Sequence, residues 1–398
     1  MAQHRLKLFQ VNITANWGST GKIAEAIGNA AIANGWESFI AYGRVANNST
    51  SHLIKVGGKI DTYIHYLYDR ILDMEGRGSV RPTKKLIEQI KAINPDIVQL
   101  HNIHDHYLNY PILFEYLNQT NIKVVWTFHD CWAFTGHCYH FAHVGCMKWR
   151  ACCEKCVQRH MLADRSCENY LIKKQLFSSC NNLTIITCSS WINNFVKQSL
   201  FKDKPTHIIH NGINLHEFRV LPYNNTQREK FKIISVSNVW NQSKGLLDLF
   251  KLRDMLSSDY EIIIVGLSPD QQYNLPKGIR GVLRTQSSRE LVELYNEADV
   301  FINLTYADTF PTVNLEALAC GTPVITYRTG GSPEAVDCHT GFVVEPGDIY
   351  GVRLAIENIE KNGKLFYTKN CRYRAEELFD MDKNYQKYIE LYNSLLHK

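Results

Sequence analysis

The stretch DTFPTVNLEALACGTPV, residues 308–324, decides how this sequence is interpreted. Asp308 lies in the loop after a predicted strand, and Pro311 opens a predicted helix over residues 312–319. A second acid, Glu316, follows eight residues after the first, inside that helix. The N–H groups of a helix N-terminus bind anions, and a carboxylate inside the helix can accept hydrogen bonds from sugar hydroxyls. The alternative, an ordinary surface position for Glu316, fits poorly with its apolar neighbours.

Short apolar runs alternate with helix-period segments along the whole chain, in two blocks. The first block has predicted strands at residues 6–13, 38–42, 96–100, 123–128, 183–188 and 207–209, with predicted helices at 22–33 and 83–93. The second block has predicted strands at 232–237, 261–265, 300–304 and 323–327, with predicted helices at 245–256, 289–298 and 312–319. This alternation is typical of parallel sheets with crossover helices.

The two blocks predict an α/β chain of two Rossmann-like domains that face an interdomain cleft. We expect residues 1–220 to form the first domain and residues 221–398 the second, joined by the polar stretch 220–230. Helix-period Tyr and Leu residues near the C-terminus predict a last helix that can cross back to the first domain. Ligands of such sheets bind beyond the carboxyl ends of the strands.

Composition and charge narrow the function classes. Of the 398 residues, 45% are hydrophobic and 21% charged, which excludes a wholly disordered chain. The net charge of +5 is uneven, since residues 1–200 carry 21 Lys and Arg against 14 Asp and Glu. A basic half can face nucleic acid, an anionic membrane or a phosphorylated substrate, or it can be a solvated surface. Because the basic residues between 148 and 174 are interrupted by acids and no nucleic-acid module is present, we expect no nucleic-acid partner.

Hydropathy predicts where the protein works. No apolar run approaches the roughly 18–20 residues that span a bilayer, and residues 1–13 lack the apolar core of a signal peptide. We therefore expect a cytoplasmic protein, with peripheral association at the inner face of the cytoplasmic membrane as a further hypothesis.

The stretch 308–324 resembles the acidic E-x7-E motif of the retaining glycosyltransferase family 4, whose members have the GT-B fold. The resemblance extends from about residue 231 to residue 347 and includes TGGSPE at 329–334 and GFVVEPG at 341–347. It implies that Glu316 holds the ribose hydroxyls of a nucleotide-sugar donor. It also implies that Asp308, in place of the family's first Glu, lies near the transferred sugar.

The same resemblance implies further donor and catalytic residues. The backbone of Phe310, Pro311, Thr312 and Val313 would meet the donor diphosphate. Lys244 would neutralise the leaving diphosphate, although an exposed Lys at a helix start is the ordinary alternative. The Arg that usually precedes this Lys is replaced by Asn238, and Arg328 is another candidate cation.

Two motifs of the first block have a functional and a structural interpretation. Gly18 and Gly21 follow the first strand and open a helix, so they could cradle a phosphate or simply form a strand–helix turn. The loop is not a Walker A motif. His129 follows the strand over residues 123–128, and the resemblance places it near the reacting sugar. The alternative is a turn residue held by backbone groups.

Six of the twelve Cys residues fall within 26 positions, which in a reducing compartment favours metal over disulfides. Cys138, Cys146, Cys153 and Cys156 would make a closed tetrahedral Zn²⁺ site of the structural kind. Cys152 could replace Cys153, and His137, His140 and His143 are spare candidates. Free thiols or a disulfide are the alternatives. A similar Cys-rich insert, here about residues 131–160, occurs in some polysaccharide-assembly members of the family.

Together these features predict a retaining glycosyltransferase with His129, Lys244 and Asp308 as catalytic residues and no catalytic metal. The donor is expected to be a UDP- or GDP-sugar, and the acceptor a glycan or a lipid-diphosphate-linked glycan. The expected pathway is capsular, exopolysaccharide or lipopolysaccharide synthesis. The alternatives are a GT-B nucleotide-sugar epimerase or phosphorylase, and a zinc-stabilised scaffold without activity.

Overall fold

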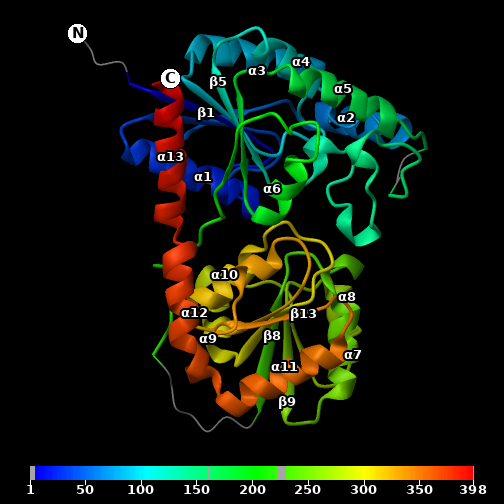
Figure 1. The fold of residues 1–398 in the computed structure, drawn as a ribbon, viewed down its shortest axis with the longest axis vertical. Coiled ribbons are helices and arrows are strands. Elements are labelled where there is room, and N and C mark those ends of the chain that lie inside the picture. Colours follow the sequence, from blue (N-terminus) through cyan, green and yellow to red (C-terminus); the bar gives the residue numbers. More distant parts are fainter. Residues whose placement is uncertain (1–4, 159–161, 223–229, 398) are drawn as a thin grey trace. The chain divides into compact units, whose positions relative to one another are not determined.

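The computed structural model describes residues 5–158, 162–222 and 230–397. The chain forms two compact units, the first made of residues 1–209 and 385–398 and the second of residues 210–384 (Figure 1). The division lies before residue 210 rather than after 220, because the intervening segment bonds to the second unit: Ile213 N–H donates to Phe379 O, and Arg372 donates to Phe218 O. Most of the predicted linker, residues 223–229, lies outside the described residues.

The first unit is built on a seven-stranded parallel sheet of order β3-β2-β1-β4-β5-β6-β7. The strands are β1 (Lys7–Asn12), β2 (Glu37–Tyr42), β3 (His52–Lys55), β4 (Ile97–Leu100), β5 (Lys123–Phe128), β6 (Leu183–Thr187) and β7 (Thr206–Ile208). The central strands are apolar and buried, as expected for a parallel sheet covered on both faces.

The helices of the first unit are α1 (Gly18–Ala33), α2 (Lys59–Leu72), α3 (Val80–Ile93), α4 (Tyr110–Leu117), α5 (Ser166–Ser178) and α6 (Ser190–Val196). The short 3₁₀ turns η1 (Trp132–Phe134), η2 (Ala142–Val144) and η3 (Lys148–Arg150) lie between β5 and α5. The predicted start of α1 at Lys22 was wrong, because the glycine segment forms its first turn. Gly21 packs there so closely that a Cβ would lie 2.6 Å from Thr14 Oγ1.

The second unit has a six-stranded parallel sheet of order β10-β9-β8-β11-β12-β13. Its strands are β8 (Phe231–Val236), β9 (Tyr260–Val265), β10 (Ile279–Val282), β11 (Val300–Asn303), β12 (Val324–Tyr327) and β13 (Gly341–Val344). Its helices are α7 (Leu246–Met255), α8 (Pro269–Tyr273), α9 (Ser288–Glu297), α10 (Thr312–Ala319), α11 (Ile349–Asn362) and α12 (Lys364–Leu378), with 3₁₀ turns η4 (Gln242–Lys244) and η5 (Ser332–Ala335). Helix α10 has the predicted bounds.

The last helix, α13 (Met381–Leu396), begins in the second unit and ends in the first, as the sequence predicted. Two buried tyrosines tie it to the first sheet, since Tyr388 OH lies 3.2 Å from Thr127 Oγ1 and Tyr392 OH donates to Gln99 Oε1 at 2.9 Å.

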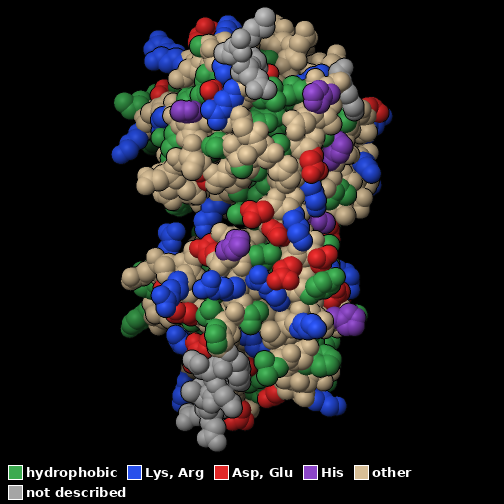
Figure 2. Space-filling model, turned by 90° about the vertical axis from the view of Figure 1, so that its left-hand side faces the viewer, with side chains coloured by type: hydrophobic (Ala, Val, Ile, Leu, Met, Phe, Trp, Pro, Cys, Tyr) green, Lys and Arg blue, Asp and Glu red, His purple; other side chains and the backbone are tan. Residues whose placement is uncertain are grey.

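Two surface properties bear on the localisation hypothesis. Within the described residues, no helix combines the length and apolarity that crossing a membrane requires. The face drawn in Figure 2 carries Lys and Arg side chains interspersed with Asp and Glu side chains, so the charge of that face is mixed.

Candidate active site

Lys244 and Asp308, 64 residues apart in the chain, form an ion pair in the second unit. Lys244 Nζ lies 2.8 Å from Asp308 Oδ2 and 3.3 Å from the carbonyl oxygen of Ala307. Both side chains keep access to solvent, at 30% and 25% exposure. A cation and a carboxylate are therefore brought together at the carboxyl end of the second sheet, where β11 gives way to α10.

The turn after η4 explains how Lys244 reaches this loop. Gly245 has a φ of +76°, and a Cβ on it would overlap the carbonyl oxygen of Leu304 at the end of β11. Only glycine combines that backbone conformation with so close an approach. Tyr306 N–H donates to Ser243 O at 2.7 Å and closes the same contact.

Helix α10 begins directly after the loop that carries Asp308. Its N-cap is Pro311, which makes no side-chain cap hydrogen bond. The backbone N–H groups of Thr312 and Val313 thus have no capping side chain, which is the arrangement that suits an anion.

Glu316 lies inside α10 and is oriented by a residue that the sequence analysis missed. Tyr295, fully buried on α9, donates its hydroxyl to Glu316 Oε2 at 2.9 Å. Burial, together with the charge of Glu316, raises the pKa of Tyr295 well above its usual value, so the phenol stays a donor. Nothing in the local pattern distinguishes Tyr295 from an ordinary core tyrosine.

The segment around Phe310 is braced from two sides. Phe310 is buried, its ring stacks on His210 with centroids 5.0 Å apart, and His210 Nε2 lies 3.1 Å from Glu334 Oε2. Gly331 N–H donates to Thr309 O at 3.0 Å. The TGGSPE motif therefore holds the loop that carries Asp308 in place. The sequence of the motif alone did not indicate this role.

The other predicted donor residues have the following surroundings, each in its own unit. Asn238 is exposed on the loop between β8 and η4, and Arg328 forms its ion pair with Glu345. Gly18 and Gly21 lie in the first turn of α1 in the first unit, where Gly21 packs on Thr14.

In the first unit, His129 follows β5 and ends a chain of three polar side chains. His129 Nε2 lies 3.1 Å from His101 Nδ1, and His101 Nε2 lies 3.1 Å from Gln10 Oε1. Gln10 donates its own N–H to Ala24 O at 2.8 Å, which fixes its amide orientation. The Gln10 oxygen accepts from His101 Nε2, so His101 Nδ1 accepts from His129 Nε2. His129 Nδ1 is then left as a lone-pair nitrogen.

The pKa directions agree with neutral rings in this chain. Burial, more than any other cause, lowers the pKa of His129 to about 4 and that of His101 well below its usual value. Both imidazoles are uncharged at neutral pH.

The neighbouring residue Asp130 forms a partly buried ion pair with His104. Asp130 Oδ2 lies 2.9 Å from His104 Nε2, and Asp130 Oδ1 accepts from Trp132 N–H at 2.9 Å. Burial alone would lower the pKa of His104, but the charge of Asp130 and its hydrogen bond outweigh it and raise that pKa to about 9. The signal for His101 and His104 was the HNIHDHY run after β4, which the sequence analysis did not use.

The four cysteines predicted to bind metal, Cys138, Cys146, Cys153 and Cys156, line one cavity of about 20 Å³ in the first unit. All twelve cysteines are free thiols.

Comparison with known protein families assigns both parts of the chain to glycosyltransferases. Residues 22–217 match the family model described as Glycosyltransferase Family 4, and residues 221–378 match the one described as Glycosyl transferases group 1. The chain is a glycosyltransferase of the GT-B type.

Relatives of this glycosyltransferase include the putative colanic acid biosynthesis glycosyl transferase WcaC of Escherichia coli K12. It is 22% identical, and the alignment covers 98% of this chain and 100% of WcaC. Among solved structures, sucrose-phosphate synthase from Thermosynechococcus elongatus superposes with a TM-score of 0.73 at 19% identity, covering 99% of this chain and 100% of that one. Anabaena HepE in complex with UDP-glucose superposes with a TM-score of 0.65 at 13% identity, covering 98% and 100%. These structures share the GT-B fold.

Proposed function

We propose that this glycosyltransferase moves a sugar from a UDP- or GDP-sugar, with retention, onto a glycan or lipid-diphosphate-linked glycan during assembly of a bacterial surface polysaccharide. The observation that carries the proposal is the cluster of Lys244, Asp308, the uncapped start of α10 and Glu316 at one end of the second sheet. The cluster offers positive groups for a diphosphate and carboxylates for hydroxyls. UDP-glucose bound to HepE and the colanic acid role in the name of WcaC agree with this assignment.

The departing nucleotide diphosphate gathers negative charge as the bond to the sugar breaks. Lys244 and the N–H groups of Thr312 and Val313 would stabilise that charge, which is the electrostatic form of catalysis. These groups are held by η4 and α10, so they need little reorganisation when charge develops. No catalytic metal is required by this arrangement.

The Lys244–Asp308 pair supplies a mechanism for donor recognition. When a diphosphate arrives, Lys244 exchanges the carboxylate of Asp308 for phosphate oxygens, and the released carboxylate accepts a hydrogen bond from a hydroxyl of the sugar. Glu316, held by Tyr295, accepts from the ribose hydroxyls. Each carboxylate thus binds hydroxyl groups of the donor, one on each side of the diphosphate.

The first unit would bind the acceptor and supply His129. Because His129 is neutral and its Nδ1 carries a lone pair, it accepts a hydrogen bond from a sugar hydroxyl rather than donating one. The charged His104–Asp130 pair holds the backbone that follows His129.

We further propose that α2 docks on the anionic inner face of the cytoplasmic membrane. Most of the exposed positions along α2 are apolar or aromatic, and Ile60 and Tyr63 are 75% and 62% exposed. The exposed set Ile60, Tyr63, Ile64, Tyr68 and Ile71 follows a helical period on one face. Leu162, 81% exposed, adjoins α2 through its N–H bond to Arg70 O. Exposed apolar patches of this kind mark interaction sites, and tyrosines suit the headgroup layer.

Helix α2 and the next helix in the chain, α3, carry exposed basic residues. Lys59 and Arg70 are exposed on α2, and Arg81, Lys84 and Lys85 are exposed on α3. Apolar insertion together with Lys and Arg is the combination that binds anionic lipid surfaces.

The experiment that tests the activity is donor hydrolysis. Purified protein is incubated with UDP-, GDP-, ADP- and dTDP-sugars, released nucleotide is measured, and Lys244→Ala is the control. Release from one donor that is lost in the variant supports the transferase. Conversion of the donor sugar without nucleotide release would point to an epimerase, and absence of both release and nucleotide-induced thermal shift would point to a scaffold.

Vesicle sedimentation tests the membrane proposal separately. Wild-type protein should co-sediment with vesicles containing anionic lipid, less so at high salt, and Ile64→Glu should abolish this. Leu365→Glu, which changes an exposed apolar residue of α12 in the second unit, is the matched control and should bind as wild type. Equal sedimentation of the two variants would contradict the role of α2.

A further inference from the structure

The segment between β5 and α5, residues 129–165, contains only the 3₁₀ turns η1, η2 and η3 as regular structure within its described residues. Without helices or strands, a segment of this length has few backbone hydrogen bonds to hold it in one conformation, so it needs another kind of support. It carries six of the twelve cysteines, and four of these line one small cavity. We infer that this cavity is a structural Zn²⁺ site with Cys138, Cys146, Cys153 and Cys156 as ligands, and that His137 is the positioning residue that joins it to Asp73.

One pair of sulfurs already has the spacing that the ion requires; the four sulfurs are not all within 4.8 Å of one another, so Cys146 and Cys153 would close around the ion on binding. Cys138 Sγ lies 3.6 Å from Cys156 Sγ. Two thiolates bound tetrahedrally at 2.3 Å from Zn²⁺ are about 3.8 Å apart. The cavity of about 20 Å³ has room for one ion or one water molecule. Thiols are weak hydrogen-bond partners for water but strong ligands for zinc, so the lining selects the ion.

The structure also chooses between the two adjacent cysteines. Cys153 is buried, lines the cavity and accepts a hydrogen bond from Gly136 N–H at 3.2 Å, a contact typical of bound thiolates. Cys152 instead points to Cys167, with the two sulfurs 2.8 Å apart. Cys152 is therefore outside the ligand set and supplies a matched control one residue away.

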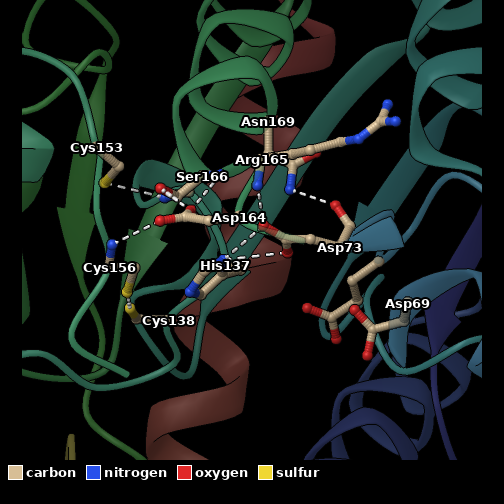
Figure 3. Close-up of polar contacts among 12 residues, drawn as sticks. Asp69, Asp73, His137, Cys138, Cys153, Cys156, Asp164, Arg165, Ser166 and Asn169 are labelled. Carbon is tan, nitrogen blue, oxygen red and sulfur yellow. Dashed lines mark hydrogen bonds and ion pairs between the residues drawn. The ribbon is translucent and has the colours of Figure 1, made fainter. Parts of the chain in front are cut away.

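His137 links the cavity to a buried carboxylate (Figure 3). Its Nδ1 lies 3.1 Å from Asp73 Oδ1, and Asp73 is fully buried at the end of α2. The other side of the ring faces Cys138 and Cys156, one ring nitrogen lying within 4.8 Å of both sulfurs. His137 Nε2 is buried and forms no hydrogen bond with the residues that the structure describes.

An N–H at this position compensates the charge of two thiolates, and the carboxylate fixes the ring. His137 is not among the residues that line the cavity, whereas all four thiols are, so we assign it the outer position.

Further bonds extend from the site to the helices on either side. Asp164 accepts from Cys156 N–H at 2.9 Å, and Asp73 accepts from Arg165 N–H at 2.6 Å (Figure 3). Lys173 on α5 donates to Trp132 O at 2.7 Å. The ion would thus fasten the loop that continues from His129 and Asp130 to α2 and α5.

Elemental analysis of protein purified under reducing conditions, without added metal, tests the proposal. We expect about one equivalent of zinc in wild type and in Cys152→Ser, and loss of most of it in Cys153→Ser and Cys156→Ser. X-ray absorption of the wild-type protein should show four sulfur ligands at about 2.3 Å, a result that does not depend on any variant folding. Zinc-free wild-type protein, or equal zinc in Cys152→Ser and Cys153→Ser, would overturn the site.

His137→Gln separates the positioning role from ligation. We expect this variant to keep four sulfur ligands and to lose zinc to a chelator roughly 10–100-fold more readily, as second-shell changes do. A wild-type spectrum with three sulfurs and one nitrogen, the nitrogen disappearing in His137→Gln, would refute the four-thiolate assignment.

Discussion

His129 Nε2 lies 3.1 Å from His101 Nδ1, and this contact sets which nitrogen of His129 is available to a ligand. We predict that His129 is neutral with its proton on Nε2, and that Nδ1 is unprotonated. Heteronuclear NMR of the ring nitrogens in ¹⁵N-histidine protein measures this directly. Because burial lowers the pKa of His129 to about 4, its signals should not titrate between pH 5 and 8.

Gln10→Met tests the chain behind that tautomer, because it removes the oxygen that accepts from His101 Nε2. The loss of one buried hydrogen bond, about 1–2 kcal/mol, should lower turnover by about 5–30-fold and mix the two His129 tautomers. Unchanged His129 signals in Gln10→Met would show that His101 does not orient it.

The His104–Asp130 pair makes folding stability depend on pH. The pKa of His104 is about 9 in the folded protein against about 6.5 when unfolded. A raised histidine pKa stabilises fully below the unfolded value and ceases to do so as pH rises through 9. The contribution is up to about 3 kcal/mol, so wild-type Tm should fall between pH 7 and 9.5 more steeply than that of His104→Gln.

The control for this comparison is His216→Gln, which changes an exposed histidine in the second unit. Its Tm profile should follow wild type. Parallel profiles for wild type and His104→Gln would mean that the pair is not charged in the folded state.

The sequence predicts those features of the structure that depend on neighbouring residues better than those that depend on contacts between distant parts of the chain. Helix α10 and strand β5 have their predicted bounds, because hydrophobic period, Pro311 and Gly321 are local signals. The proximity of Lys244 and Asp308 could also be expected, since each residue follows one of two neighbouring parallel strands, β8 and β11. The start of α1 was mispredicted, because the packing of Gly21 on Thr14 is a tertiary contact that propensity does not contain.

The residues that the sequence missed act through partners far away in the chain. Tyr295 is 21 positions from Glu316, and His101 is 91 from Gln10. No local periodicity distinguishes these side chains from core residues, so only the fold reveals them. The same holds for α2, whose exposed apolar face becomes informative only when its burial is known.

Tyr295→Phe should weaken the donor site without unfolding it. The phenol donates to Glu316 Oε2 and is buried, and removing the hydroxyl leaves that oxygen without this donor. We expect the donor KM to rise about five-fold, the effect of about 1 kcal/mol, with kcat nearly unchanged.

Steady-state kinetics of Tyr295→Phe, Glu316→Gln and the double variant check this mechanism. If Tyr295 acts through Glu316, the double variant should resemble Glu316→Gln alone. Additive losses in the double variant would show that Tyr295 contributes by packing.

Lys244→Ala should cost far more in turnover than in stability. In the proposed mechanism its amine stabilises the diphosphate, and loss of one such group from a preorganised site lowers kcat by about 10²–10³-fold. Because Lys244 is partly exposed, the Tm of Lys244→Ala should lie within about 2 °C of that of the wild-type protein. Lys91→Ala, which removes an exposed ion pair on α3, is the matched control and should leave kcat unchanged.

Asp308→Asn separates donor binding from chemistry, because in the proposed mechanism this carboxylate competes with phosphate for Lys244. Nucleotide diphosphate alone should bind Asp308→Asn more tightly, by up to about five-fold, since a partly exposed ion pair worth up to about 1 kcal/mol no longer has to be broken. Turnover of the nucleotide sugar should fall in the same variant, because the amide replaces the carboxylate that, in the proposed mechanism, accepts a hydrogen bond from the sugar hydroxyl. Calorimetry with UDP and GDP measures the first effect and donor hydrolysis the second. Weaker diphosphate binding in Asp308→Asn would contradict the exchange of Lys244 between Asp308 and phosphate, and would mean that Asp308 instead holds Lys244 in its binding position.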